Sequence, residues 1–196
     1  MKTKYIATAI IAMTLVASCK NETKTVETEA VKEVEKKVEK VEEEVVTKRV
    51  KMALESKSDS KATGSVVFEE SNGTVKMIAS INGLSPGTHA IHIHAKADCS
   101  SADGKSTGGH WNPTAQPHGA WGAAEGYHKG DIGNFEADAK GNGAKEFSTD
   151  EWCIGCGDEK KDILGKAIIV HAGTDDLTSQ PSGAAGKRVS CGGIIM

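Results

Sequence analysis

The sequence predicts an all-β fold, an eight-stranded antiparallel barrel or sandwich, and two observations favour it. Short β-rich runs recur along the chain, and turn-forming stretches such as Asn82-Gly83 separate them. The 196 residues include 22 glycines, whereas aromatic residues make up only 4%. Such a composition suits short strands and many turns better than a bundle of helices.

The expected strands share β-branched or alternating apolar residues and end at turn-forming stretches. They are residues 50–56, 64–70, 74–81, 89–95, 131–138, 143–149, 165–172 and 188–195. Residues 167–170, AIIV, alternate little, which predicts a well-buried strand. Residues 96–130 contain no convincing strand, and a connection of this length in a compact domain usually has a function.

The first 18 residues are expected to be a lipoprotein signal peptide. Lys2 and Lys4 precede an apolar run that is too short to span a membrane, and small residues lead to Cys19. The stretch resembles a bacterial lipoprotein signal, in which Cys19 becomes the lipidated N-terminus. The alternative is an ordinary signal peptide followed by an incidental cysteine.

Residues 19–47 are expected to be a charged tether between the lipid and a globular domain at 48–196. Lysine and glutamate separate valines that are spaced by three and four residues. The alternative is a dimerising coiled coil, but the pattern lasts only about two heptads, fewer than a coiled coil needs. The net charge of −3 gives no indication of a nucleic acid partner.

Four cysteines remain beyond Cys19. They are Cys99, Cys153, Cys156 and Cys191. Outside the cytoplasm thiols tend to oxidise, so we expect two disulfides, for which three pairings are open.

The histidines indicate metal binding. In the run THAIHIHA (88–95), His92 and His94 share one face of a strand, while Ile91 and Ile93 share the other. Two imidazoles at this spacing can bind one metal ion, and the alternative is an exposed polar face.

The long connection that follows carries a second set of ligand types. Three histidines, His110, His118 and His128, lie there, and Asp131 comes three residues after the last. Three imidazoles and one carboxylate complete a tetrahedral zinc site with no position open for water, so this zinc would be structural. One more histidine, His171, follows the apolar run AIIV.

Together these motifs resemble the copper–zinc superoxide dismutase family. The resemblance covers about residues 50–196 and lies in GTHAIHIHA (87–95), GGHWNP (108–113), PHG (117–119), HKGDIGN (128–134), VHAGTDDL (170–177) and GKRVSCG (186–192). It implies a Greek-key β-barrel with long metal-binding and electrostatic loops. It also implies conversion of superoxide to oxygen and hydrogen peroxide by copper that cycles between Cu(II) and Cu(I).

The resemblance assigns every histidine. The implied copper ligands are His92, His94, His110 and His171, and the implied zinc ligands are His110, His118, His128 and Asp131. His110 would then bridge both metals and help to deliver protons. His89 would support a copper ligand from behind, and Asp175 would accept hydrogen bonds from a histidine of each site, whereas Asp176 would be solvated.

Arg188 is the implied docking group for the superoxide anion. Its guanidinium is permanently charged and can hydrogen-bond a small anion. Lys187 and Lys129 are expected to add positive potential, although residues 178–188 carry few charges for an electrostatic loop. The alternative for Arg188 is an ordinary surface arginine.

The resemblance also implies a disulfide between Cys99 and Cys191. The other two cysteines, Cys153 and Cys156, depart from the family pattern. We favour a local disulfide that stiffens an exposed loop. A site for metal capture or thiol exchange is the alternative.

The sequence therefore predicts an exported enzyme of the cell envelope, periplasmic or surface-exposed, with copper and zinc as cofactors. The alternative is a non-catalytic copper-binding or copper-delivery module on the same fold, which a missing copper ligand or a missing arginine would favour. A purely structural zinc protein would leave His92, His94 and His171 without a role. The sequence does not decide between a monomer and a homodimer.

Overall fold

The computed structural model describes residues 47–196. The predicted signal peptide, Cys19 and nearly all of the predicted tether lie outside the described residues. Within residues 47–196, no helix is long and apolar enough to cross a membrane.

All eight predicted strands are present, with ends that differ from the predicted ones by at most two residues. They are β1 (Lys48–Ser56), β2 (Thr63–Ser71), β3 (Thr74–Asn82), β4 (Gly87–His94), β5 (Gly133–Ala137), β6 (Gly143–Thr149), β7 (Ala167–His171) and β8 (Arg188–Gly193). The connection after β4 contains no regular strand, as predicted, and only a short 3-10 helix at Lys105–Thr107.

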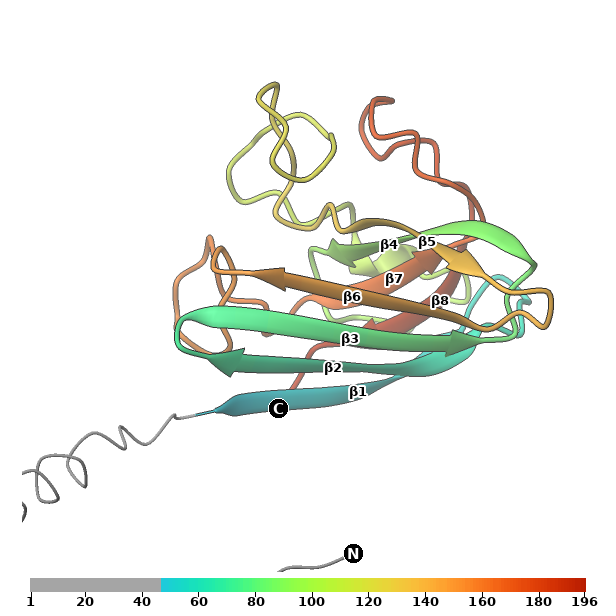
Figure 1. The fold of residues 1–196 in the computed structure, drawn as a ribbon, viewed down its shortest axis with the longest axis horizontal. Helices are drawn as coiled ribbons and strands as arrows, with labels where there is room; N and C mark the ends of the chain where they lie inside the picture. Colours follow the sequence, from blue (N-terminus) through green and yellow to red (C-terminus); the bar gives the residue numbers. More distant parts are fainter. Residues whose placement is uncertain (1–46) are drawn as a thin grey trace, which may run out of the picture. The chain divides into compact units, whose positions relative to one another are not determined.

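The strands form a closed antiparallel barrel in the order β1-β2-β3-β6-β5-β4-β7-β8 (Figure 1). Pairing of Glu55 in β1 with Cys191 in β8 closes it. The chain passes from β3 to β4 across β6 and β5, so the topology is a Greek key, as predicted. Closure leaves this sheet without free edges.

Alternating side chains fill the barrel interior. In β3, four apolar residues from Val75 to Ile81 are fully buried, and the residues between them are exposed. Phe68 of β2 packs edge-on against Trp152, with ring centroids 6.1 Å apart. This period of two is what a strand with one face toward a core requires.

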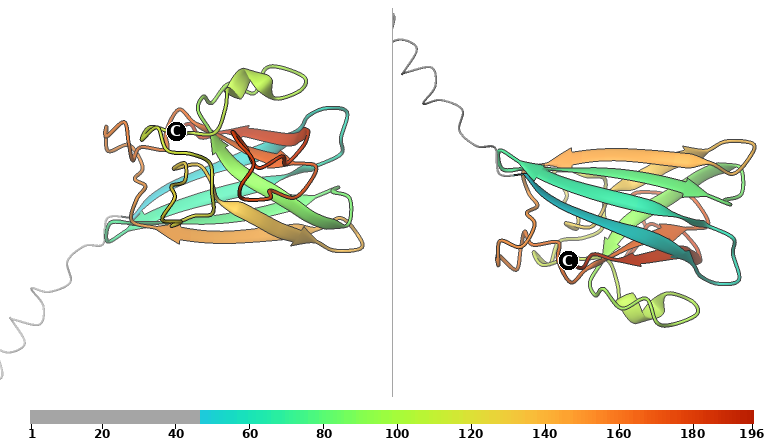
Figure 2. Two further views of the ribbon diagram at one scale, coloured as in Figure 1. Left: turned by 90° about the horizontal axis from the view of Figure 1, so that it is seen from above. Right: turned by 90° about the horizontal axis from the view of Figure 1, so that it is seen from below.

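The strand β4 departs from this alternation, since all residues from His89 to His94 are buried. Ile91 and Ile93 belong to the hydrophobic core, and the alternating geometry directs His92 and His94 outward. Two long loops, residues 95–132 and 172–187, rise on this side of the barrel (Figures 1 and 2). The histidines are therefore buried beneath loops and are not exposed on the barrel wall.

Backbone contacts hold the first loop against the end of β4. Trp111 N–H donates to the Ile93 carbonyl, and Ile93 N–H donates to the Gly130 carbonyl. A Cβ atom at residue 130 would overlap with the Ile93 carbonyl oxygen, so this approach requires glycine. The residues between these contacts are thereby fixed relative to the barrel.

The disulfide between Cys99 and Cys191 joins the same loop to β8, with the two Cα atoms 5.9 Å apart. Lys57 Nζ donates to the Cys99 carbonyl at 2.6 Å and adds a contact from the connection after β1. The pairing that the family resemblance implied is thus present.

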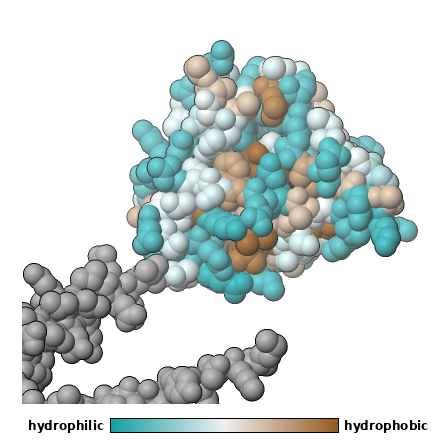
Figure 3. Space-filling model, in the orientation of Figure 1, coloured by the Kyte–Doolittle hydropathy of each residue, from teal (hydrophilic) through white to brown (hydrophobic). Residues whose placement is uncertain are grey.

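The barrel face seen in Figure 3 is largely hydrophilic, with small hydrophobic groups between the polar ones. Among the described residues, the exposed large hydrophobic side chains are Ile78, Ile195 and Met196. These residues do not identify a partner surface, and the homodimer stays a prediction.

Replacing Cys99 and Cys191 with serine is expected to lower the free energy of unfolding by about 4 kcal/mol, because the disulfide closes a long segment of the unfolded chain. Its cysteines are 92 residues apart, whereas Cys153 and Cys156 are separated by 3. The corresponding serine pair at 153 and 156 is the control, with an expected loss of about 2 kcal/mol. Urea denaturation measures both, and equal losses would contradict this account.

Candidate metal centre

Four histidine side chains converge from three parts of the chain beside β4. They are His92, His94, His110 and His171, and each offers one ligand atom within 4.8 Å of the others. Two come from β4, one from the first loop and one from the end of β7. These are the residues that the sequence predicted as copper ligands, and the structure brings all four together.

Their hydrogen bonds establish which nitrogen atoms are free. His94 Nδ1 lies 2.9 Å from the Gly108 carbonyl, and His171 Nδ1 lies 3.4 Å from the Gly186 carbonyl. A carbonyl can only accept, so these Nδ1 atoms carry the proton and each neutral ring keeps a lone pair on Nε2.

In the other two rings, the hydrogen-bond partner of one nitrogen is a carboxylate. His92 Nε2 lies 2.8 Å from Asp175 Oδ2, and His110 Nδ1 lies 2.8 Å from Asp131 Oδ1. The remaining nitrogen of each of the four rings is buried and has no hydrogen-bond partner among the described residues. Four buried lone pairs that face one another fit a copper ion held by imidazoles.

A second group surrounds one carboxylate. The Nδ1 atoms of His110, His118 and His128 lie 2.8, 3.0 and 3.2 Å from the oxygens of Asp131. These four side chains can also place one ligand atom each within 4.8 Å of one another, and this donor set suits tetrahedral zinc. His110 belongs to both groups, with Nδ1 toward Asp131 and Nε2 toward the other histidines.

Asp175 connects the two groups. One oxygen pairs with His92 at 2.8 Å, and the other pairs with His118 at 2.9 Å. The Asn134 side chain in turn donates to the Asp175 carbonyl and accepts from its N–H, both at 2.8 Å. Asp176 is exposed, as predicted. Of these two neighbouring aspartates, only Asp175 forms hydrogen bonds with the histidines.

His89 lies behind the site, as the resemblance implied. Its Nδ1 is 2.8 Å from the His171 carbonyl, and its Nε2 is 2.8 Å from the Ser85 carbonyl. The ring is buried and joins β4 to the end of β7. It thus fixes the backbone that carries His171.

Sequence reasoning missed two residues whose hydrogen bonds hold the zinc group in place. The Gln180 side chain accepts from His118 N–H and donates to the His118 carbonyl, both at 2.9 Å. The Trp152 indole donates to the Lys129 carbonyl, one residue after His128. Gln180 and Trp152 lie far from these ligands in sequence, so local patterns carry no sign of either contact.

The protonation of the histidines follows their surroundings. Burial, and then the charge of His110, lower the pKa of His94 well below its ordinary value. Burial also lowers the pKa of His110 to about 4, although its hydrogen bond with Asp131 opposes this. Both rings are therefore neutral near pH 7 and present lone pairs to a metal.

His118 behaves in the opposite way. Burial acts to lower its pKa, but hydrogen bonds with Asp131 and Asp175 outweigh it and raise the pKa to about 9. In the metal-free protein this ring is doubly protonated and positively charged at neutral pH. A carboxylate faces each of its two nitrogens.

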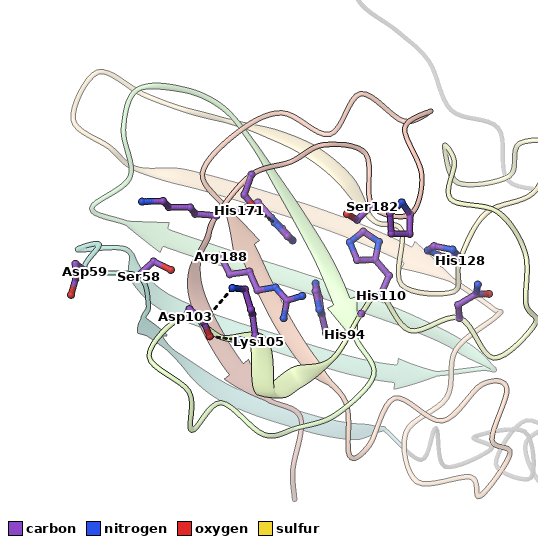
Figure 4. A pocket seen from close by; sticks show the side chains of 15 residues that line it. Ser58, Asp59, His94, Asp103, Lys105, His110, His128, His171, Ser182 and Arg188 are labelled. Carbon is purple, nitrogen blue, oxygen red and sulfur yellow. Dashed lines mark hydrogen bonds and ion pairs between the residues drawn. The ribbon is translucent and has the colours of Figure 1, made fainter.

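A pocket of about 700 Å³ opens beside the first group of histidines (Figure 4). His94, His110 and His171 line it together with Arg188, whose side chain points toward His94. Arg188 Nη1 donates to the Gly104 carbonyl at 2.8 Å and to Thr107 Oγ1 at 3.1 Å. The Arg188 guanidinium is therefore held in one orientation.

The two lysines that were expected to add positive potential lie differently. Lys187 lines the pocket, whereas Lys129 is not among the lining residues and is paired with Glu151. Lys105 lines the pocket instead and is paired with Asp103 at 3.0 Å. The ion pair with Glu151 spans 22 residues, which the local sequence does not reveal.

Replacing Asp175 with asparagine is expected to weaken zinc and copper binding by about ten- to a hundredfold, because one residue orients a ring in each group. Asp176→Asn is the matched control and should leave both affinities unchanged. Competition with a chelator measures the affinities, and equal effects of the two substitutions would contradict the role of Asp175.

Zinc binding to the metal-free protein at pH 7 is expected to release a proton from His118, whose pKa is about 9 without metal. Zinc affinity should therefore rise as pH increases from 7 to 9 and level off above that. Calorimetry in buffers of different ionisation enthalpy counts the protons, and a pH-independent affinity over this range would contradict the assignment.

Comparisons with known proteins agree with this geometry. The sequence model of the family described as copper/zinc superoxide dismutase matches residues 62–194. Superoxide dismutase [Cu-Zn] 2 of Mesembryanthemum crystallinum is 39% identical over 141 residues, which cover 68% of this chain and 87% of that protein. Superoxide dismutase [Cu-Zn] 2 of Aquifex aeolicus is 35% identical, over 70% of this chain and 81% of that protein.

A solved structure is similar as well. The crystal structure of a SOD-like protein from Bacillus subtilis is 30% identical, with a TM-score of 0.66, and the match covers 74% of this chain and 97% of that chain. The matched profile spans more than half of the chain and includes every ligand position described above. The chain belongs to the copper/zinc superoxide dismutase family.

Proposed function

We propose that this protein is a superoxide dismutase that converts two superoxide anions and two protons into oxygen and hydrogen peroxide. The observation that carries the proposal is the arrangement of four buried imidazole nitrogens beside a pocket that also contains Arg188. The residues fit both metals of the family. His92, His94, His110 and His171 would hold copper, and His110, His118, His128 and Asp131 would hold zinc.

The two ions contribute different properties. When bound, copper supplies the one-electron couple between Cu(II) and Cu(I) that can both oxidise and reduce superoxide, whereas zinc has no redox chemistry. All four zinc ligands come from the first long loop, and Asp131 lies two residues before β5. Their common role is to keep His110 and the loop in one position.

Arg188 would dock the substrate anion. Its hydrogen bonds to Gly104 and Thr107 leave the planar guanidinium facing the pocket beside His94. A guanidinium can form charge-assisted hydrogen bonds with an anion, and it stays charged at any relevant pH. Lys187 and Lys105 line the same pocket and add positive charge, while Asp59 and Asp103 offset part of it.

His110 is the group that can handle a proton at the site. Its Nδ1 is fixed toward Asp131, and its ring lines the pocket. A proton held on Nε2 would be released directly beside the docked anion.

We also propose that the protein is exported and attached to a membrane of the cell envelope through a lipid on Cys19. The apolar run before Cys19 supports export, and two disulfides in the described domain suit an oxidising compartment.

The Cys19→Ser protein is therefore expected to move from the membrane fraction to the soluble fraction of the cell envelope. Fractionation with immunodetection measures this, and metabolic labelling with a fatty acid reports the lipid itself. Cys156→Ser serves as the control for loss of a cysteine. Unchanged membrane partitioning of the Cys19 variant would contradict the anchor.

The copper- and zinc-loaded protein is expected to remove superoxide rapidly, and Arg188→Ala should lower the rate about ten- to a hundredfold through loss of a charge-assisted hydrogen bond. The chain's other arginine, Arg49, pairs with Glu69 on the barrel surface, and Arg49→Ala is the matched control. His171→Ala should abolish the activity.

Pulse radiolysis measures these rates, and metal analysis verifies loading. Full loading with negligible turnover would contradict the enzyme and would support the copper-binding or copper-delivery module. Equal rates for the Arg188 and Arg49 variants would contradict the docking role of Arg188.

A further inference from the structure

The connection between β6 and β7 carries a third group of ligand types, separate from the two histidine groups. Cys153, Cys156 and Asp162 can place one ligand atom each within 4.8 Å of one another. The cysteines form a disulfide, and it lies in a part of the chain that the proposed dismutase reaction does not use. Cys153 is buried, whereas Cys156 is exposed and accessible to a reductant in solution.

The backbone of this loop is held by contacts that do not depend on the disulfide. Ile154 N–H donates to Glu70 Oε2 at 2.9 Å, and the Ile154 carbonyl accepts from Lys48 Nζ at 2.8 Å. The neighbouring Cys153 forms a parallel bridge with Asp162. Opening the disulfide would therefore leave Cys153 and Asp162 side by side.

The Asp162 carboxylate is already oriented. It accepts backbone N–H groups of Gly155, Gly157 and Leu164 at 2.9 to 3.0 Å. Burial acts to raise its pKa, but these hydrogen bonds outweigh burial and lower it, so the group is an anion at neutral pH. Two carboxylate oxygens offer about four lone-pair positions, and the Cys156 N–H is a fourth donor, so a metal ion would take the place of that hydrogen bond.

We propose that reduction of the Cys153–Cys156 disulfide creates a third metal site, in which the two thiolates and the Asp162 carboxylate bind Zn²⁺. A dithiol reductant would transfer two electrons and two protons to the disulfide and become a disulfide itself. Zn²⁺ would then displace one proton from each of the two thiols.

The geometry and charge suit a divalent ion. Two sulfur atoms bound to tetrahedral zinc lie about 3.8 Å apart, so the two cysteine sulfurs, which are bonded in this structure, would separate after reduction. Three protein ligands leave the fourth position open. The charge of the carboxylate raises the pKa of nearby thiols and therefore opposes thiol exchange. A bound cation would lower the pKa of the same thiols and favour the thiolates.

The test uses the full chain with Cys19→Ser, loaded with copper and zinc, so that only four cysteines remain. A dithiol reduces the exposed disulfide, and alkylation with mass spectrometry verifies that Cys153 and Cys156 are free while Cys99 and Cys191 stay paired. Co²⁺ is the probe, because its thiolate complexes absorb in the near ultraviolet. Oxidised protein treated with Co²⁺ in the same way measures how much Co²⁺ replaces the metals of the two histidine groups.

Reduced protein is expected to bind one more equivalent of Co²⁺ than oxidised protein, with a thiolate charge-transfer band. The band should vanish in the protein with serine at 153 and 156. Asp162→Asn should weaken binding at least tenfold, whereas Glu159→Gln, an exposed acid of the same loop, should have no effect.

Two results would overturn the proposal. One is no additional Co²⁺ in protein whose thiols at 153 and 156 are shown to be free. The other is equal affinity of the Asp162→Asn variant and the parent protein, which would remove the carboxylate from the site.

Discussion

Four imidazole nitrogens buried together as unpaired acceptors are the constraint around which this structure is arranged. Each belongs to a ring whose other nitrogen is committed to a carbonyl or a carboxylate. A buried polar atom without a partner costs about 1–3 kcal/mol, so the metal-free protein must hold these rings in place through other contacts. A bound metal ion would remove this cost, and binding would therefore stabilise the native fold.

The barrel supplies part of that support, and the loops supply the rest. Ile91 and Ile93 anchor β4 in the core, so that His92 and His94, each next to one of them, have fixed directions. The loop histidines do not lie on strands, and their positions depend on individual contacts. Gln180 holds His118 by its backbone, and the Trp152 indole holds the segment between His128 and Asp131. Asp175 then joins both histidine groups through one carboxylate.

The sequence allowed prediction of features that depend on local pattern. The Asn82-Gly83 turn and the alternation in β3 were sufficient to place strands, because both act within a few residues. The metal ligands could be assigned because their motifs resemble those of a known family. The continuous burial from His89 to His94 was not predictable from alternation, since the two loops that cover these residues have no regular pattern. The same limitation applies to the ion pair of Lys129, whose partner Glu151 lies 22 residues away in the connection after β6.

The central claim is that two metals share the His110 ring, and anomalous diffraction tests it most directly. Crystals of the copper- and zinc-loaded protein would be measured on both sides of the copper and zinc absorption edges. We expect one copper peak at Nε2 of His110, beside His92, His94 and His171, and one zinc peak at Nδ1, beside Asp131. A single peak for both elements, or a zinc peak away from Asp131, would contradict this account.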